Sequence, residues 1–305
     1  MTTIDKLIKK HVFITLKNFD GIPCYHFACD RVLHELLLPL DPHSHKGTFG
    51  HVLALQGHEN FIGASRLSLL GALRAGTGLA TLLCKDSIQH HPADLFEFIK
   101  IKDRDLTIEY LKKISALVIG PGLSKDTNLQ NWGLEMLHQA GAIVPNIIID
   151  ADALNLLKRL DPAFMGTSVL CTPHPKEAAL LLDISIATLE SDRLAALNRL
   201  ATLPINKKCS IIWLLKGSTT LIYHKKMGIF ALEGNAPLLS TGGSGDLLAG
   251  AIAGLVSQTN SLLEAAILAV NLMIAAARKN SFLMDRGMLP SELSQHFPYL
   301  LKRKF

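Results

Sequence analysis

The chain has 305 residues, of which 49% are hydrophobic and 19% charged, so it can bury a large core in one α/β domain or two smaller ones. Its net charge of +5 comes from 31 basic and 26 acidic residues. The sequence has no basic stripe with interleaved aromatic side chains, which argues against nucleic-acid binding. The five cysteines are an odd number without a Cys-x-x-Cys pair, which argues against a disulfide framework or a structural zinc site.

Neither the N-terminus nor the most apolar window indicates a membrane partner. Residues 1–6 lack the apolar core of a signal peptide. The window 265–277 is shorter than the roughly 20 residues that a membrane-spanning helix needs. We therefore expect a protein of the reducing cytoplasm.

Residues 1–44 carry the weakest pattern, and we interpret them as a lead-in segment. Short apolar pieces alternate there with charges, and the stretch is too short to bury much of its own surface. The remaining residues, 45–305, are expected to form a single domain.

The first strong pattern is a strand–helix–strand unit. Its segments are an apolar strand, a loop, a helix and a second strand, at residues 51–55, 56–64, 65–75 and 78–83. Gly76 follows the helix, as helix C-termini prefer. Such a unit predicts a parallel sheet, in which ligands bind beyond the carboxyl ends of the strands. The loop is then a candidate binding segment or a plain connector.

Two further strands end in sequences that can contact a ligand. Residues 116–119 precede Gly120-Pro121-Gly122, where the glycines allow close approach of a ligand or simply make a turn. Residues 146–149 precede Asp150-Ala151-Asp152-Ala153-Leu154-Asn155, whose oxygen atoms suit Mg²⁺. The alternatives are that Asp152 caps the next helix and that Asp150 has a structural role, which we favour for Asp150.

The strand at residues 168–171 leads to a histidine between two prolines. Pro173 and Pro175 fix the backbone on both sides of His174, so its imidazole could hydrogen-bond a substrate at the strand end. A solvated loop histidine is the alternative. Residues 178–182 then predict a helix.

The next part predicts a polar helical crossover and a hairpin. The crossover covers residues 183–208, and the strand 210–215 returns through the turn 216–220 to a strand at 221–224. An ordinary hairpin explains this turn. A lysine and small hydroxyl side chains at a sheet edge can also bind a phosphate or ribose.

The glycine-rich stretch Thr241-Gly242-Gly243-Ser244-Gly245-Asp246 precedes an apolar helix at residues 247–256. The free N–H groups of a helix start favour a bound phosphate. Asp246 would then lie beside the anion and take a proton from a substrate hydroxyl. The alternative is that Asp246 only stabilises the helix start, by about 0.3–1 kcal/mol. Small residues in this helix, including Gly250 and Gly254, predict close packing on a neighbouring helix.

Together these elements predict a parallel-rich sheet between two helix layers, with an antiparallel hairpin late in the chain. The motifs, in this order, resemble those of the ADP- or ATP-dependent NAD(P)H-hydrate dehydratases of the ribokinase-like superfamily. The matching segments are residues 45–47, 50–55, 63–64, 74–79, 120–123, 150–155, 172–177, 215–218 and 241–246.

The resemblance implies a three-layer α/β/α ribokinase-like fold and a nicotinamide-cofactor repair enzyme, a carbon–oxygen lyase. Its substrate would be the S-epimer of hydrated NADH or NADPH, whose ring hydroxyl takes a phosphoryl group from ADP or ATP, with Mg²⁺, and leaves as phosphate. Homo-oligomers, most simply a homotetramer, are implied as well.

The resemblance also assigns residues. Asp246 would be the base and would contact the substrate together with Ala64, Gly122 and His174. The nucleotide would be bound by Lys216, Gly217, Ser218, Thr219, Thr220, Gly243, Ser244 and Gly245. Asp152 and Asn155 would support the metal and phosphates.

The chain departs from the family pattern in three ways. Thr48 stands where an acid is usual, Ser124 stands where relatives often have glycine, and a histidine common near Leu272 is absent. Many relatives add an epimerase domain, for which about 45 N-terminal residues are too few, so we expect dehydratase activity alone. The alternatives are a vitamin or sugar kinase of the same superfamily and a non-catalytic nucleotide-binding protein.

Overall fold

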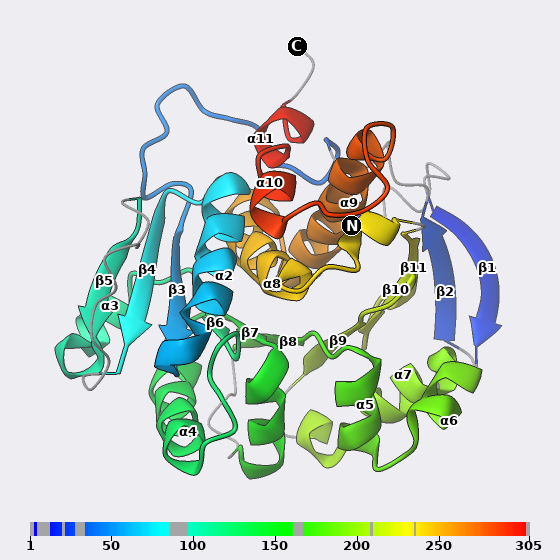
Figure 1. The fold of residues 1–305 in the computed structure, drawn as a ribbon, viewed down its shortest axis with the longest axis horizontal. Coiled ribbons are helices and arrows are strands. Elements are labelled where there is room, and N and C mark those ends of the chain that lie inside the picture. Colours follow the sequence, from blue (N-terminus) through cyan, green and yellow to red (C-terminus); the bar gives the residue numbers. More distant parts are fainter. Residues whose placement is uncertain are drawn as a thin grey trace.

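A mixed sheet crosses the molecule and carries helices on both faces (Figure 1). The computed structural model describes residues 3–4, 13–19, 22–27, 34–85, 97–160, 167–207, 210–234 and 236–302. Within these residues the sheet has 11 strands in the order β1-β2-β11-β10-β9-β8-β7-β6-β3-β4-β5. The strands are β1 (Phe13–Phe19), β2 (Ile22–Phe27), β3 (His51–Gln56), β4 (Leu79–Cys84), β5 (Ile99–Lys102), β6 (Ala116–Ile119), β7 (Asn146–Ile149), β8 (Ser168–Cys171), β9 (Ile211–Leu215), β10 (Thr219–His224) and β11 (Gly228–Glu233).

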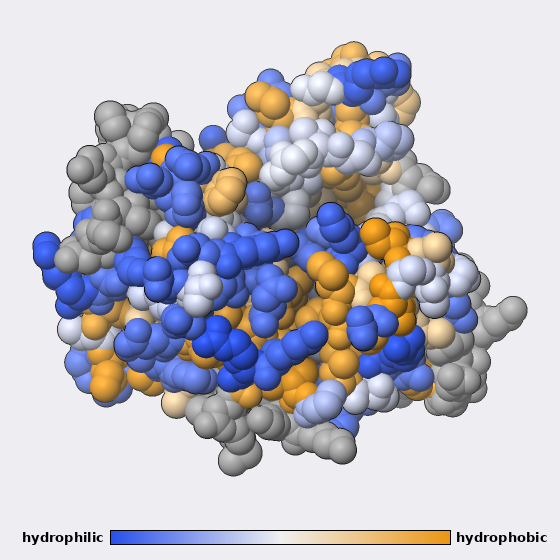
Figure 2. All heavy atoms as spheres, turned by 60° about the horizontal axis from the view of Figure 1, so that its bottom comes forward, coloured by the Kyte–Doolittle hydropathy of each residue, from blue (hydrophilic) through white to orange (hydrophobic). Residues whose placement is uncertain are grey.

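The helices form two layers, as predicted. The layer at the top of Figure 1 contains α2 (Ile62–Arg74), α8 (Ser244–Leu255), α9 (Leu262–Asn280), α10 (Pro290–Ser294) and α11 (Phe297–Leu300). The other layer contains α4 (Thr127–Gly141), the 3-10 helix η4 (Ala151–Arg159), α5 (Pro175–Leu182), α6 (Ile186–Ser191) and α7 (Arg193–Ala201), and α3 (Ile108–Leu111) lies near β5. Figure 2 brings the α4–α7 side forward and shows mostly hydrophilic residues there, with hydrophobic ones exposed between them.

The central strands are apolar throughout because both faces of the sheet are covered. In β6, Ala116 and Val118 pack into the core under α2, α8 and α9, whereas Leu117 and Ile119 pack into the core on the α4–α7 side. The other central strands alternate in the same way. Continuous apolar runs are typical of such doubly covered parallel strands.

The strand order reverses beside β3. This strand pairs in parallel with β4 on one side and with β6 on the other, for example through Val52 with Ala80 and with Ala116. From β6 the chain continues away from β4, through β7, β8 and β9. The carboxyl ends of β3 and β6 therefore flank the reversal point, where open α/β sheets bind ligands.

Glycines let α8 approach α2 backbone to backbone. A Cβ added to Gly250 would lie 1.7 Å from the carbonyl oxygen of Ser68, and one added to Gly254 would lie 2.5 Å from that of Ala72. Side chains of any size are excluded at such separations. The close packing predicted from the small residues of this helix is confirmed.

Two features extend or shift the predicted elements. The antiparallel pairing of β10 with β9 and β11 confirms the late hairpin, and β1–β2 add a second hairpin, with β2 parallel to β11. The domain boundary at residue 44 stays a prediction. The crossover at 183–208 is helical, as predicted, and contains α6 and α7.

The helix predicted at 65–75 begins earlier, at Ile62, because a 3-10 turn (Glu59–Phe61) continues into α2. His58 caps this turn, since its ring Nδ1 accepts the Asn60 N–H. Across the described residues, no helix is both long and apolar enough to cross a membrane.

Candidate active site

The predicted binding segments follow the strands β3, β6, β7, β8 and β9, whose carboxyl ends lie at one edge of the sheet. The first two segments are in direct contact, since the His58 N–H donates to the Gly122 carbonyl at 2.9 Å. The last two are linked as well, since the Lys216 N–H donates to the Pro173 carbonyl at 2.9 Å. The sequence motifs thus meet at one edge, as the strand-end argument predicts.

Gly122 is placed by a backbone that only glycine adopts easily. Its φ is +72°, and an added Cβ would lie 2.6 Å from the Phe61 carbonyl oxygen. Ser124 also has a φ of +72°, which gives a physical reason why glycine is common there in relatives. Ala64 lies in the first turn of α2, and not in the preceding loop as expected.

The start of α8 presents an uncapped helix end to the site. Gly243 takes the N-cap position with φ +91°, and no side chain accepts a hydrogen bond there. Asp246 lies in the first turn, and its backbone carbonyl accepts a hydrogen bond of 3.0 Å from the Ser68 hydroxyl. This end of the helix is therefore anchored to α2 while its first N–H groups are available to an anion.

A buried ion pair lies against this helix end. The Lys216 ammonium is 2.7 Å from Asp150 Oδ1, and the Asp150 side chain is only 2% exposed. A Cβ on Gly245 would be 3.3 Å from the same ammonium. Burial alone would lower the pKa of Lys216, but Asp150 and Glu177 raise it, so this lysine stays charged beside the anion site.

Asp246 is a largely buried carboxyl with a raised pKa. Burial raises its pKa to about 7, the Asp150 carboxylate adds to the rise, and Lys216 opposes it. A carboxylate that titrates near neutral pH is a better proton acceptor than a solvated one. The glycine-rich turn is thus followed, in the first turn of α8, by a carboxyl whose pKa lies near neutral.

His174 is held by Glu177 of the same turn. The imidazole Nδ1 accepts the N–H groups of Lys176 and Glu177 at 3.1 and 3.3 Å, while Glu177 Oε2 accepts the His174 N–H at 2.8 Å. Burial lowers the pKa of His174, so the neutral ring carries its proton on Nε2, 3.3 Å from Glu177 Oε1. His174 is therefore both a helix cap and an oriented ring at the site.

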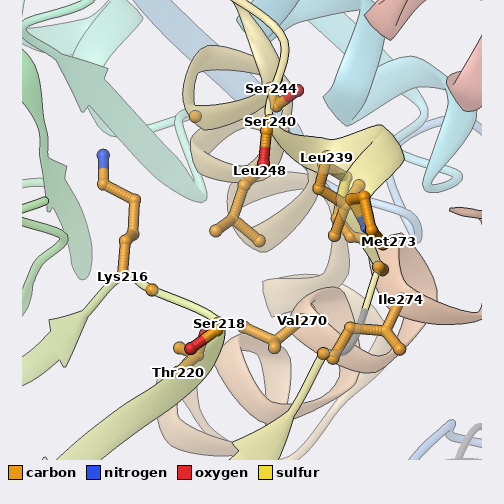
Figure 3. Close-up of a pocket in the computed structure, with 15 residues that line it drawn as sticks. Lys216, Ser218, Thr220, Leu239, Ser240, Ser244, Leu248, Val270, Met273 and Ile274 are labelled. Atoms are coloured by element: carbon orange, nitrogen blue, oxygen red, sulfur yellow. The ribbon is translucent and has the colours of Figure 1, made fainter. Parts of the chain in front are cut away.

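A cavity of about 550 Å³ opens beside Lys216 and the start of α8 (Figure 3). Its apolar wall comes from Leu239, Leu248, Val270, Met273 and Ile274. Six predicted nucleotide-binding residues also line it, namely Lys216, Gly217, Ser218, Thr220, Ser244 and Gly245. An apolar pocket with polar groups at one end suits a purine base and its phosphates.

Gly243 and Thr219, also predicted for the nucleotide, do not line this cavity. Thr219 already belongs to β10, and its carbonyl accepts a hydrogen bond of 3.1 Å from Arg193. Arg193 also donates to the Lys216 carbonyl at 3.0 Å and lies against Gly217. This arginine, which sequence reasoning missed, fixes the shape of the turn.

A second cavity of about 260 Å³ contains the predicted metal-binding pair. Asp152 and Asn155 line it together with His174 and Glu177, and with three lysines at positions 125, 158 and 176. The Asn155 amide donates to the backbone carbonyl of Asp152 at 3.0 Å.

The residues of this cavity do not form a magnesium site of their own. Among the described residues, no three His, Cys, Asp or Glu side chains are grouped to hold a metal. The lysines around Asp152 would oppose a cation, and Asp150 is already paired with Lys216. The assignment of Asp152 and Asn155 to a metal therefore stays a prediction without geometric support.

Asp150 and Glu177 also lie at this edge of the sheet, although the sequence assigned neither of them a role in catalysis or binding. The sequence favours a structural role for Asp150, yet it lies at the centre of the site as the partner of Lys216. Its position directly after an apolar strand was the available signal. Glu177 lies in the segment 172–177 that resembles the family, but a glutamate three residues after a helix cap also has an ordinary capping role.

The layers, the strand reversal and the uncapped start of α8 define a ribokinase-like α/β protein. A solved structure from Enterococcus faecalis, described as a ribokinase-like superfamily protein, matches with a TM-score of 0.76 and 27% identity over 94% of this chain and 98% of that one. The sequence model of the NAD(P)H-hydrate dehydratase family matches residues 52–299, and the chain belongs to this family.

Individual relatives agree with the family. The ADP-dependent (S)-NAD(P)H-hydrate dehydratase of Streptococcus pneumoniae is 30% identical, over 89% of this chain and 93% of its own length. The ADP/ATP-dependent NAD(P)H-hydrate dehydratase of Bacillus subtilis, co-crystallised with ATP/Mg²⁺, has a TM-score of 0.71 at 28% identity over 87% of this chain and 93% of its own. The chain spans about half the length of the bifunctional NAD(P)H-hydrate repair enzymes that it matches at 30–34% identity.

Proposed function

We propose that this chain dehydrates the S-epimer of NADH hydrate or NADPH hydrate, using ADP or ATP to phosphorylate the ring hydroxyl. The observation that carries the proposal is the position of Asp246, a carboxyl with a pKa of about 7 at the uncapped start of α8, among Lys216, Asp150 and Glu177. Such a carboxyl can activate a hydroxyl next to a bound phosphate.

The first step is phosphoryl transfer. Asp246 takes the hydroxyl proton, and the oxygen attacks the terminal phosphorus of the nucleotide. The bond between that phosphorus and the bridging oxygen breaks, so that AMP leaves from ADP, or ADP from ATP. The N–H groups at Gly245 and Asp246 and the Lys216 ammonium stabilise the charge on the phosphoryl oxygens. The nucleotide occupies the cavity of about 550 Å³, with its phosphates towards Lys216.

The second step is elimination. The carbon–oxygen bond breaks and phosphate departs with the electron pair, while the neighbouring ring carbon loses a proton and the ring double bond is restored. Hydroxide is a poor leaving group and phosphate a good one, which explains why a nucleotide is consumed. Ala64, Gly122 and His174 are the proposed contacts to the dinucleotide.

The test is to incubate the protein with hydrated NADH and either ADP or ATP and to follow the absorbance of the reduced ring. Its recovery supports the proposal. A kinase of the same superfamily would instead phosphorylate an alcohol such as a thiazole or pyridoxal and leave the hydrate unchanged. A non-catalytic binding protein would consume neither substrate. A homotetrameric state and a cytoplasmic location remain predictions.

A further inference from the structure

The proposed elimination requires a second proton acceptor. Reversing the addition of water across a double bond removes a hydroxyl from one carbon and a proton from its neighbour. Asp246 has already accepted the hydroxyl proton during phosphoryl transfer. Another group must accept the carbon-bound proton, and this need rests on the proposed function.

Two neighbouring groups are poorly suited to this task. Asp150 has only 2% of its side chain exposed, and its Oδ1 is already occupied by the Lys216 ammonium at 2.7 Å. The His174 ring accepts two backbone N–H groups at Nδ1 and directs its Nε2 towards Glu177, so neither nitrogen is free to take a proton.

We propose that Glu177 accepts the proton from the ring carbon. Its side chain is 19% exposed and lines the cavity of about 260 Å³ together with His174, the proposed contact to the dinucleotide. Its carboxylate is fixed at both oxygens, since Oε2 accepts the His174 N–H at 2.8 Å and Oε1 lies 3.3 Å from His174 Nε2.

The electrostatic surroundings agree with this role. Burial raises the pKa of Glu177, and Lys216 partly opposes the rise. In the step itself, the carbon–hydrogen bond breaks and its proton goes to Glu177. The electron pair of the carbon–hydrogen bond forms the ring double bond, and phosphate leaves with the electron pair of the carbon–oxygen bond. The proton then passes to solvent through the cavity.

The local structure permits a variant that separates chemistry from folding. Glutamine at the third helical position also completes a capping box, so Glu177→Gln keeps the hydrogen bond to the His174 backbone but cannot take a proton. Glu292→Gln is the matched control, because Glu292 caps α10 in the same way, through a 2.9 Å bond from the Leu289 N–H, and is exposed.

The experiment follows single turnovers by rapid quench, with nucleotide cleavage and ring restoration measured separately. Hydrate prepared in heavy water carries deuterium on the reacting carbon. For Glu177→Gln we expect ring restoration to slow by about 100-fold or more, the usual contribution of a general base, and far more than any change in nucleotide cleavage. Ring restoration should also show a larger deuterium isotope effect than in the wild type. Glu292→Gln should match the wild type in both phases.

Two results would overturn the inference: ring restoration at the wild-type rate in Glu177→Gln, or an equal slowing of both phases, as a purely structural residue would give. A wild-type protein that consumes no hydrate would instead contradict the proposed function, and this inference would fail with it. The wild-type and control traces therefore tell the two failures apart.

Discussion

Replacing Asp246 with asparagine should stabilise the fold at alkaline pH while it abolishes turnover. Burial and the Asp150 carboxylate raise the pKa of Asp246 from 3.8 to about 7. The folded chain therefore holds this proton more tightly than the unfolded chain. The stability that this brings is complete below pH 3.8 and is lost as the pH rises through 7.

The size of the effect follows from the shift. At about 1.4 kcal/mol for each pKa unit, ionising Asp246 in the folded chain costs roughly 4 kcal/mol more than in the unfolded chain. Asn keeps the shape of the side chain but is never ionised. Its stabilising effect should therefore approach a few kcal/mol near pH 8 and be small near pH 4.

Urea unfolding of both proteins at the two pH values measures this difference. Glu109→Gln is a suitable control, because Glu109 is an exposed carboxylate paired with Lys112 and should change stability by less than about 1 kcal/mol at either pH. A variant Asp246→Asn that is less stable than the wild type near pH 8, or equally stabilised at both pH values, would refute the reasoning. The same variant should bind nucleotide but lose turnover by about 10²–10⁴-fold.

Four further results are expected. In the wild type, kcat/KM should rise with pH through about 7 as Asp246 ionises, and a pH–rate profile without this limb would argue against Asp246 as the base. Lys216→Met should destabilise the fold by about 3–5 kcal/mol, because Asp150 would be left buried and unpaired, and adding Asp150→Asn should recover part of the lost melting temperature. Gly63→Ala should raise the free energy of unfolding by roughly 1 kcal/mol, because an added Cβ there meets nothing within 4 Å. Gly250→Ala should lower it by several times that amount, because the added Cβ would meet the backbone of Ser68. Val270→Phe should fill the cavity of about 550 Å³ beside Lys216, so that the melting temperature of the variant no longer rises with ADP or ATP.

The sheet and the glycine-rich start of α8 were predictable because their signals are local. Strands covered on both faces appear as short apolar runs, as at residues 116–119, and a glycine-rich turn before an apolar helix marks the start of α8. Parallel strands then bring their following loops to one edge. The order of strands and loops in the sequence therefore predicted that His174 and Lys216 lie near each other.

The different surroundings of the Asp150 and Asp152 side chains were not predictable in this way. Ala151, between them, has a φ of +48°, an uncommon value for a residue other than glycine. Asp150 pairs with Lys216, while Asp152 lines the smaller cavity. The pairing of β2 with β11 is similarly invisible in the sequence, because it joins segments about 200 residues apart, as Tyr25 with Phe230 shows.

The charges of the site explain why burial of Asp246 serves binding as well as catalysis. Lys216 faces three carboxylates, from Asp150, Glu177 and Asp246, so the fully ionised group would repel the phosphates of an incoming nucleotide. With a pKa of about 7, Asp246 is protonated in a large share of molecules at neutral pH, which reduces that repulsion. The N–H groups at the start of α8 attract the phosphates independently of any proton. The same burial therefore keeps the base strong enough to take the hydroxyl proton and limits the negative charge that the nucleotide meets when it binds.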